Sequence, residues 1–165
     1  MYRLIFIFVI IILPFFLFGQ KKKECFQSKI EDESVFTKVE SPPYFIGGQG
    51  TFQCFLKQYS SFHLLADELL RKDSVYLDTA RVRFIISRYG VMSDLSVTKS
   101  KSDAFKKEMY RMIKVTACSW TPGNFSGRLV NGWVQMDFFF MLKRNDDGFL
   151  QHNFIVKYYD YKTDD

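Results

Sequence analysis

The sequence is poor in the residues that most enzymatic and metal sites need. It contains two histidines and three cysteines in 165 residues, and no two cysteines have the C-x-x-C spacing. A zinc site recognisable from sequence is therefore excluded. The signature motifs of serine hydrolases, metalloproteases, P-loop proteins and dinucleotide-binding folds are absent as well. We expect no metal, no cofactor and no enzymatic activity.

The few titratable residues that catalysis would use are not paired by spacing. His63 stands beside an apolar helical stretch and is expected at the surface or at the edge of the core. His152 lies in the C-terminal strand region, and no acidic residue stands at a sequence spacing that would indicate a pair with it. Asp94 and Asp137 are strand carboxylates without an evident partner, and either would suit a charge that protects a sheet edge.

Charge of one sign is also scarce. The formal net charge is +5, without a basic tract near an aromatic platform, so binding to nucleic acid is not expected. Hydrophobic residues make up 47% and aromatic residues 18%, which is typical of a small globular domain with a dense core.

One long apolar run is present, at the N-terminus. Arg3 precedes the 15 residues from Leu4 to Phe18, in which only Pro14 is not strongly apolar, and Lys21 to Lys23 follow. A spanning helix needs about 20 apolar residues, whereas the core of a signal peptide needs about 7–15. We therefore expect residues 1–20 to be a signal peptide and the protein to be exported to the periplasm or cell envelope. An uncleaved anchor is the alternative, and only that form would be attached to a membrane.

Export would place the cysteines in an oxidising compartment. Cys25, Cys54 and Cys118 are an odd number, so at most one internal pair can form. Cys54 falls on a predicted helix and Cys118 at the end of another. The sequence leaves open which pair forms, and whether all three are instead small buried hydrophobic residues.

The first part of the mature chain predicts a leader and two short helices. Residues 21–41 are polar with mixed charge and are expected to be loosely ordered, up to the break at Ser41-Pro42-Pro43. A helix is expected to begin near Thr51, and a second helical piece covers residues 63–71. The first helix has one apolar face, formed by Phe52, Phe55, Leu56 and Tyr59.

The middle of the chain predicts a hairpin and a further helix. Residues 80–86 alternate apolar and polar side chains, and Val91 to Lys99 return after a turn at Gly90. Ser100 and Asp103 resemble a helix-capping box. The lysine-rich outer side of that helix normally reflects solvation, and an anionic partner surface is the alternative.

The last part predicts two strands. Val130 to Leu142 is the longest strand candidate, and after a turn at residues 146–148 Phe149 to Tyr159 is a final strand or strand-like tail. The order helix, strand, strand, helix, strand, strand predicts an α+β domain in two layers, an antiparallel sheet packed by two or three helices. We place the domain at residues 42–142 and the tail at 143–165.

Several short motifs stand in an order that resembles one family. Pro43 to Gly48 resembles a Pro-x-Phe-Pro-Gly-Gly entrance, with Ile46 in place of the second proline, and Glu108-x-x-Arg111 and Trp120-x-Pro-Gly follow at fitting distances. The chain thereby resembles the C-terminal domain of TonB-type energy transducers, in the form common in Bacteroidetes. The resemblance gives a structural role to Gly47, Gly48, Gly90, Glu108, Arg111, Trp120, Pro122, Gly123 and Gly127.

The resemblance also implies a function. In that family an exposed sheet edge receives a short extended peptide from an outer-membrane receptor, by strand addition. The strand from Gly132 to Leu142 is then the candidate edge, and its partner is a protein segment, from a TonB-dependent receptor or from a second copy. The implied partner-binding residues are Gly132, Trp133, Val134, Gln135, Met136 and Phe138. Alternatively, the tail from Phe149 to Tyr159 covers that edge, which leaves a structural or assembly role in the envelope.

Overall fold

The computed structural model describes residues 24–30, 34–71 and 74–159. The apolar segment predicted as a signal peptide, residues 1–20, lies outside these described residues. Within them, no helix is long and apolar enough to cross a membrane.

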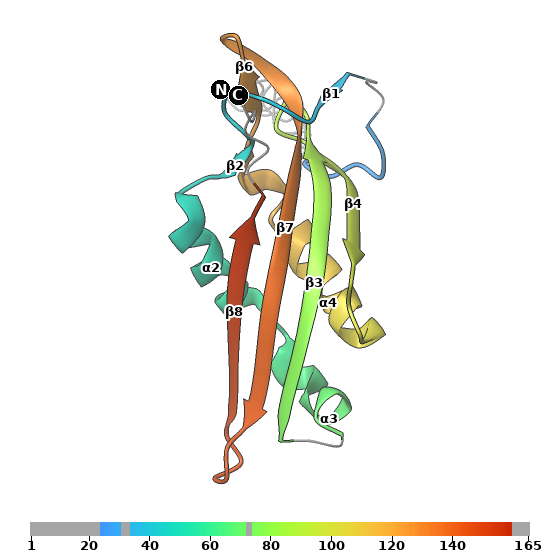
Figure 1. The fold of residues 1–165 in the computed structure, drawn as a ribbon, viewed down its shortest axis with the longest axis vertical. Coiled ribbons are helices and arrows are strands. Elements are labelled where there is room, and N and C mark those ends of the chain that lie inside the picture. The colour runs from blue at the N-terminus through green and yellow to red at the C-terminus, as the bar shows by residue number, and fades with distance from the viewer. Residues whose placement is uncertain (1–23, 31–33, 72–73, 160–165) are drawn as a thin grey trace, which may run out of the picture.

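The described chain mixes helices and strands, so the fold class is α+β as expected (Figure 1). In chain order the elements are β1 (Val35–Phe36), β2 (Tyr44–Phe45), α2 (Gly48–Tyr59), the 3-10 helix η2 (Phe62–Leu65), α3 (Ala66–Leu69), β3 (Val75–Ile86), β4 (Met92–Thr98), α4 (Asp103–Val115), the 3-10 helix η3 (Ala117–Ser119), β5 (Trp120–Thr121), β6 (Gly123–Phe125), β7 (Arg128–Arg144) and β8 (Leu150–Tyr158).

Strand β7 lies in the middle of the main sheet, between β8 and β3 (Figure 1). It pairs antiparallel with β3 from Gly132 opposite Ile86 to Lys143 opposite Val75, and β4 continues the sheet beyond β3. On its other side β7 pairs antiparallel with β8 and, over two residues, parallel with β1. Strands β2 and β5 form a separate two-stranded sheet.

The core lies on one face of this sheet. The period-two pattern of the strands turns alternate side chains inward, where they are buried against the helices. Phe52 of α2 lies 6.4 Å from Phe138, ring centroid to ring centroid, and Phe105 of α4 lies 5.0 Å from Phe140. The inward strand residues of β3 and β7 are Ala80, Val82, Phe84, Ile86, Val134, Met136, Phe138, Phe140 and Leu142.

Helix α4 starts differently from the expected Ser100–Asp103 box. Its N-cap is Ser102, whose hydroxyl oxygen accepts a hydrogen bond from the N–H of Phe105 at 3.3 Å. The Ser100 hydroxyl instead lies within hydrogen-bond distance of the Ser102 carbonyl, at 2.8 Å, and of the Asp78 carboxylate, at 3.1 Å. Asp78 is buried and accepts hydrogen bonds from the β4–α4 connection. Because a buried carboxylate needs donors, Ser100 serves Asp78, and Ser102 caps the helix in its place.

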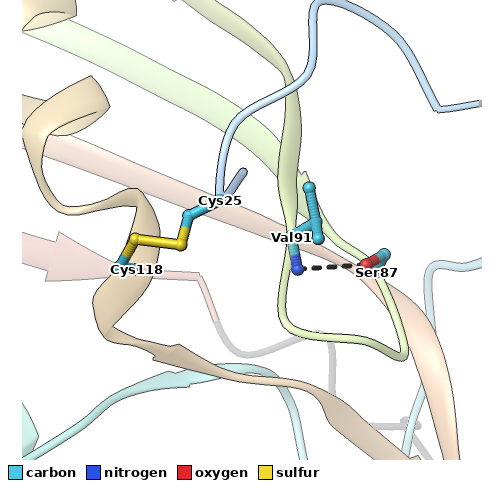
Figure 2. The surroundings of a disulfide bond; sticks show 4 residues. All are labelled: Cys25, Ser87, Val91 and Cys118. Atoms are coloured by element: carbon cyan, nitrogen blue, oxygen red, sulfur yellow. Dashed lines mark hydrogen bonds between the residues drawn. A yellow bond between two sulfur atoms is a disulfide. The ribbon is translucent and has the colours of Figure 1, made fainter. Parts of the chain in front are cut away.

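The expectation of a loosely ordered leader, residues 21–41, is wrong for the residues described there. Cys25 is buried and forms a disulfide with Cys118 of η3, beside the β3–β4 turn (Figure 2). In that turn the Ser87 hydroxyl oxygen accepts a hydrogen bond from the Val91 N–H at 3.0 Å. The leader is therefore fixed at two places, to η3 by the disulfide and to the sheet by the pairing of β1 with β7.

The strand from Gly132 to Leu142 is not the open edge of the sheet, which corrects the expected partner-binding strand. Gly132 lies between Ile86 of β3 and Phe36 of β1. Met136 and Phe138 pair with Tyr158 and Val156 of β8 as well as with β3. The physical reason is the hairpin after β7, which folds the last strand back onto the side that β3 leaves free.

Candidate functional site: the outer edge of β8

The hairpin between β7 and β8 is made by a four-residue turn. The Gly148 N–H donates to the Asn145 carbonyl at 2.8 Å, and Gly148 has a φ of 80°, which an L-residue rarely adopts. The Asn145 N–H in turn donates to the Phe149 carbonyl at 2.9 Å. The expected turn at residues 146–148 therefore sets the register of the strand that follows.

The register shows which backbone groups of β8 face β7. It runs without a shift from Arg144 opposite Leu150 to Met136 opposite Tyr158, and just beyond it the Tyr159 N–H donates to the Gln135 carbonyl at 3.0 Å. Hydrogen-bonded and non-hydrogen-bonded pairs alternate in an antiparallel ladder. The hydrogen-bonded pairs at the two ends of the ladder contain Phe149 and Tyr159, which are both odd-numbered. The odd-numbered residues of β8 therefore form the hydrogen bonds to β7.

The even-numbered residues of β8 therefore turn their backbone N–H and C=O groups away from β7. Among the described residues, β8 pairs with no strand other than β7. The one described group that reaches this row is the Gln49 side-chain amide of α2, which donates to the Val156 carbonyl at 3.4 Å. We call the backbone groups of Leu150, His152, Phe154, Val156 and Tyr158 the outer row.

The side chains of β8 fix the strand to the domain. Phe154 and Val156 are each 5% exposed and belong to the core, while Ile155 on the opposite face is 62% exposed. Lys157 is the single charged residue of the strand, and no proline or bulge interrupts it. Charges, prolines, bulges and covering helices are the usual protections of a sheet edge. At β8 these protections are Lys157 and helix α2, which reaches the strand through Gln49 and Phe52.

An apolar surface lies next to the outer row on the exposed face of the sheet. Phe139 stands opposite Ile155 and Met141 opposite Asn153 in the β7–β8 register. Phe139 is 45% exposed and Leu77, opposite Met141 on β3, is 59% exposed. A strand added to β8 would therefore have apolar neighbours for alternate side chains on this face.

The six residues expected to bind the partner are distributed over both faces of β7. Val134, Met136 and Phe138 are buried in the core, so their side chains are not available to a partner. Trp133 and Gln135 lie on the opposite face and are partly exposed; the Arg83 guanidinium lies 3.9 Å from the centroid of the Trp133 ring.

Gly132 has a packing role. A Cβ atom at this position would come within 2.8 Å of the Pro43 side chain. Since real Cβ atoms do not approach so closely, glycine is required for Pro43 to pack against β7.

The motif residues of the family resemblance hold the domain together. Glu108 is buried and accepts hydrogen bonds from Arg111 at 2.7 Å and from the Ser61 N–H at 2.6 Å. Arg111 also donates to the Tyr59 carbonyl at 2.6 Å. This pair joins α4 to the segment between α2 and η2, which explains the Glu-x-x-Arg spacing as a structural clamp.

Trp120 is a core residue. It is 3% exposed, and its indole N–H donates to the Thr116 hydroxyl at 2.9 Å. Its ring makes edge contacts with Phe45, Phe52 and Phe84 at centroid distances of 4.9 to 5.6 Å.

The remaining motif glycines lie at turns and close contacts. Gly47 precedes α2 with a φ of 89°, and a Cβ there would meet the Thr51 side chain at 2.8 Å. Gly123 follows Pro122 and begins β6, next to the Ser41 carbonyl. Gly48, Gly90 and Gly127 also have positive φ values.

His152 and Asp94 make polar contacts within the domain, whereas His63 lies at the surface. Ser60 Oγ lies 3.0 Å from His152 Nε2, and burial, with the nearby charges of His63 and Lys57, lowers the pKa of His152. His63 is exposed, and the Asp94 carboxylate accepts a hydrogen bond from the Ile30 N–H at 2.9 Å. No group of three or more metal-ligating side chains exists in the part of the chain that the structure describes.

Asp137 is the carboxylate with the clearest partners. It accepts hydrogen bonds from Arg81 at 2.7 and 2.8 Å and from the Tyr159 hydroxyl. The bonds from Arg81 lower the pKa of Asp137 to about 2. Arg81 comes from β3, Asp137 from β7, and Tyr159 follows β8. Their side-chain contacts therefore connect the edge strand to the sheet.

Two features of the structure were not predicted from the sequence, the outer row of β8 and the buried carboxylate of Asp78. The sequence predicts a strand or strand-like tail from Phe149 to Tyr159, but it does not show which amides face outward. Asp78 had a usable signal, because it stands at an inward position two residues before Ala80, where a carboxylate needs several donors.

Comparisons of the chain with known protein families, with curated proteins and with solved structures found no match.

Proposed function

We propose that the chain is an exported, non-enzymatic protein-binding module of the cell envelope. It binds an extended segment of a partner protein by strand addition, at the outer row of β8. The observation that carries the proposal is the row itself: β8 presents the N–H and C=O groups of five alternate residues, and among the described residues only Gln49 reaches them. Such a row is the template that strand addition uses.

The proposal takes the domain as a two-layer fold that resembles the C-terminal domain of TonB-type transducers. The packing of α2, η2 and α4 rings against the inner face of the sheet supports this arrangement. The clamp between Glu108 and Arg111 and the buried Trp120 give the family-like motifs structural roles. By that likeness the partner is a segment of an outer-membrane TonB-dependent receptor.

Export is supported by two independent features. The apolar run from Leu4 to Phe18 has the length of a signal-peptide core. The Cys25–Cys118 disulfide fits an oxidising compartment, where such bonds persist.

The open edge lies at β8, whereas the family resemblance places it at the strand that corresponds to β7. This difference favours a second candidate function. Because β8 fills the side of β7 where that family would take its peptide, the domain would be a structural or assembly protein of the envelope with a self-completed sheet. The observation that favours it is the burial of Phe154 and Val156, which makes β8 part of the core.

Two proline substitutions separate these functions. His152→Pro removes an N–H of the outer row, whereas Asn153→Pro removes an N–H that bonds to β7. We expect the His152→Pro protein to stay folded and to lose capture of receptor from an envelope extract, while His152→Ala, which keeps the N–H, retains it. If His152→Pro captures the same proteins as the unmodified protein does, strand addition at β8 is wrong. It is also wrong if the unmodified protein captures no receptor.

A further inference from the structure

The opposite edge of the sheet, β4, already accepts an extended segment of this chain. Phe26 forms a parallel bridge with Met92, in which the Gln27 N–H donates to the Met92 carbonyl and the Met92 N–H to the Cys25 carbonyl, both at 2.8 Å. Strand addition is therefore geometrically feasible at β4, because one short instance of it is present in the fold.

The rest of this edge runs from Leu95 to Thr98, and its residues Ser96 to Thr98 pair with β3 on one side. On its other side no described strand pairs with it. A groove of about 390 Å³ opens beside it, between β4 and α4. Its lining residues are Val97, Asp103, Lys106, Lys107 and Tyr110.

The wall that α4 contributes is basic and aromatic. Lys106, Tyr110 and Lys114 are spaced i, i+4, i+8 and so follow one line along the helix. Lys114 Nζ lies 4.5 Å from the centroid of the Phe26 ring, so this line runs from the groove toward the segment that bridges Met92. Lys106 and Lys107 are exposed, and Asp103 is the one carboxylate among the residues that line the groove.

We propose that this groove binds an extended, acidic polypeptide segment. The segment joins the edge of β4 from Leu95 to Thr98, and its acidic side chains pair with Lys106 and Lys107. Tyr110 supplies an apolar face with a polar tip for a neighbouring side chain. Backbone bonds supply affinity, and the basic wall selects for acidic sequences. This site is distinct from the outer row of β8 and does not depend on the function proposed there.

The experiment uses a fluorescent synthetic peptide of alternating valine and glutamate, titrated with the mature protein. We expect saturable binding that the double variant Lys106→Glu, Lys107→Glu weakens at least about tenfold, because charge-assisted hydrogen bonds are lost and repulsion replaces them. The matched control Lys57→Glu, Lys143→Glu makes the same change of net charge at exposed positions on α2 and β7, and should change binding less than about twofold. The neutral variant Lys106→Gln, Lys107→Gln should fall between them, which keeps the test valid if the glutamates disturb folding.

Backbone involvement is tested in the same samples. Amide hydrogen exchange within Leu95 to Thr98 should slow when the glutamate peptide is bound.

Three results would overturn the proposal. Equal losses in the groove and control variants would mean diffuse attraction, and equal binding of a valine–lysine peptide would mean that charge does not select. Lysine-dependent binding to phosphatidylglycerol vesicles without binding to the peptide would assign the surface to a membrane.

Discussion

Arg81 and Asp137 face each other across β3 and β7, with Arg81 Nε 2.7 Å from one carboxylate oxygen of Asp137 and a terminal guanidinium nitrogen 2.8 Å from the other. The Tyr159 hydroxyl, from the residue after β8, donates to the same carboxylate. One ion pair thus connects three neighbouring segments of the sheet, including the edge on which the proposed function depends.

This ion pair predicts an acid-dependent loss of stability. The bonds from Arg81 lower the pKa of Asp137 from 3.8 to about 2, so its contribution to folding is present above the higher value and is lost as pH falls toward the lower one. Asp137→Asn should remove this part of the pH dependence in urea unfolding. Asp146→Asn, at an exposed turn position, is the control and should leave the slope unchanged. Identical slopes in all three proteins would contradict the assignment.

The disulfide predicts a large redox dependence of stability. Cys25 and Cys118 are 93 residues apart in the sequence, and a cross-link over such a loop contributes about 4–5 kcal/mol in the chain-entropy description. Cys118→Ser should lower the free energy of unfolding by about that amount, measured by denaturant titration of the oxidised protein. Cys54→Ser, at the exposed free cysteine, should stay within about 0.5 kcal/mol. If a reductant leaves the unmodified protein as stable as before, the leader is held by its other contacts instead.

The buried indole predicts a large packing effect. Trp120→Ala should destabilise the domain by about 3–5 kcal/mol, the usual cost of emptying a large aromatic site. Lys107→Ala, at an exposed position, should stay within about 0.5 kcal/mol. Denaturant melts of both variants measure the difference, and equal small effects would show that Trp120 does not anchor the core.

Burial of the last strand predicts the result of truncation. Deleting residues 145–165 removes Phe154 and Val156 from the core and exposes the side of β7 that they cover. We expect the shortened protein to lose its cooperative unfolding transition or to associate through β7. Circular dichroism with a thermal melt, and sedimentation, separate these outcomes. A stable monomer with unchanged melting would mean that β8 is an accessory tail.

Local patterns predicted the elements whose signals are local. The alternation in residues 80–86 corresponds to β3, the strand candidate from Val130 to Leu142 corresponds to β7, and the helix predicted after the turn at Ser100 corresponds to α4. β3 nevertheless begins five residues earlier than the alternation indicates, at Val75, because its extent follows the length of β7 opposite it.

Features that depend on distant partners were not predictable in the same way. Nothing near Cys25 indicates Cys118 as its partner, and nothing in the β7 sequence shows that β8 and β1 occupy its second side. The choice of β7 as the open edge was wrong for this reason, and the alternative, in which the tail from Phe149 to Tyr159 covers β7, agrees with the observed pairing. The face to which a side chain points is encoded locally, whereas the neighbours and the ends of a strand depend on which strands pair with it.

The most direct test of strand addition at β8 is residue-resolved amide hydrogen exchange of β8, with and without the captured receptor segment. In the free protein the amides of Asn153, Ile155 and Lys157 should exchange slowly, because they bond to β7, and those of His152 and Phe154 should exchange fast. On binding, His152 and Phe154 should become slow while the odd-numbered residues stay as they were. Bound segment with fast exchange at His152 and Phe154 would contradict strand addition at this edge.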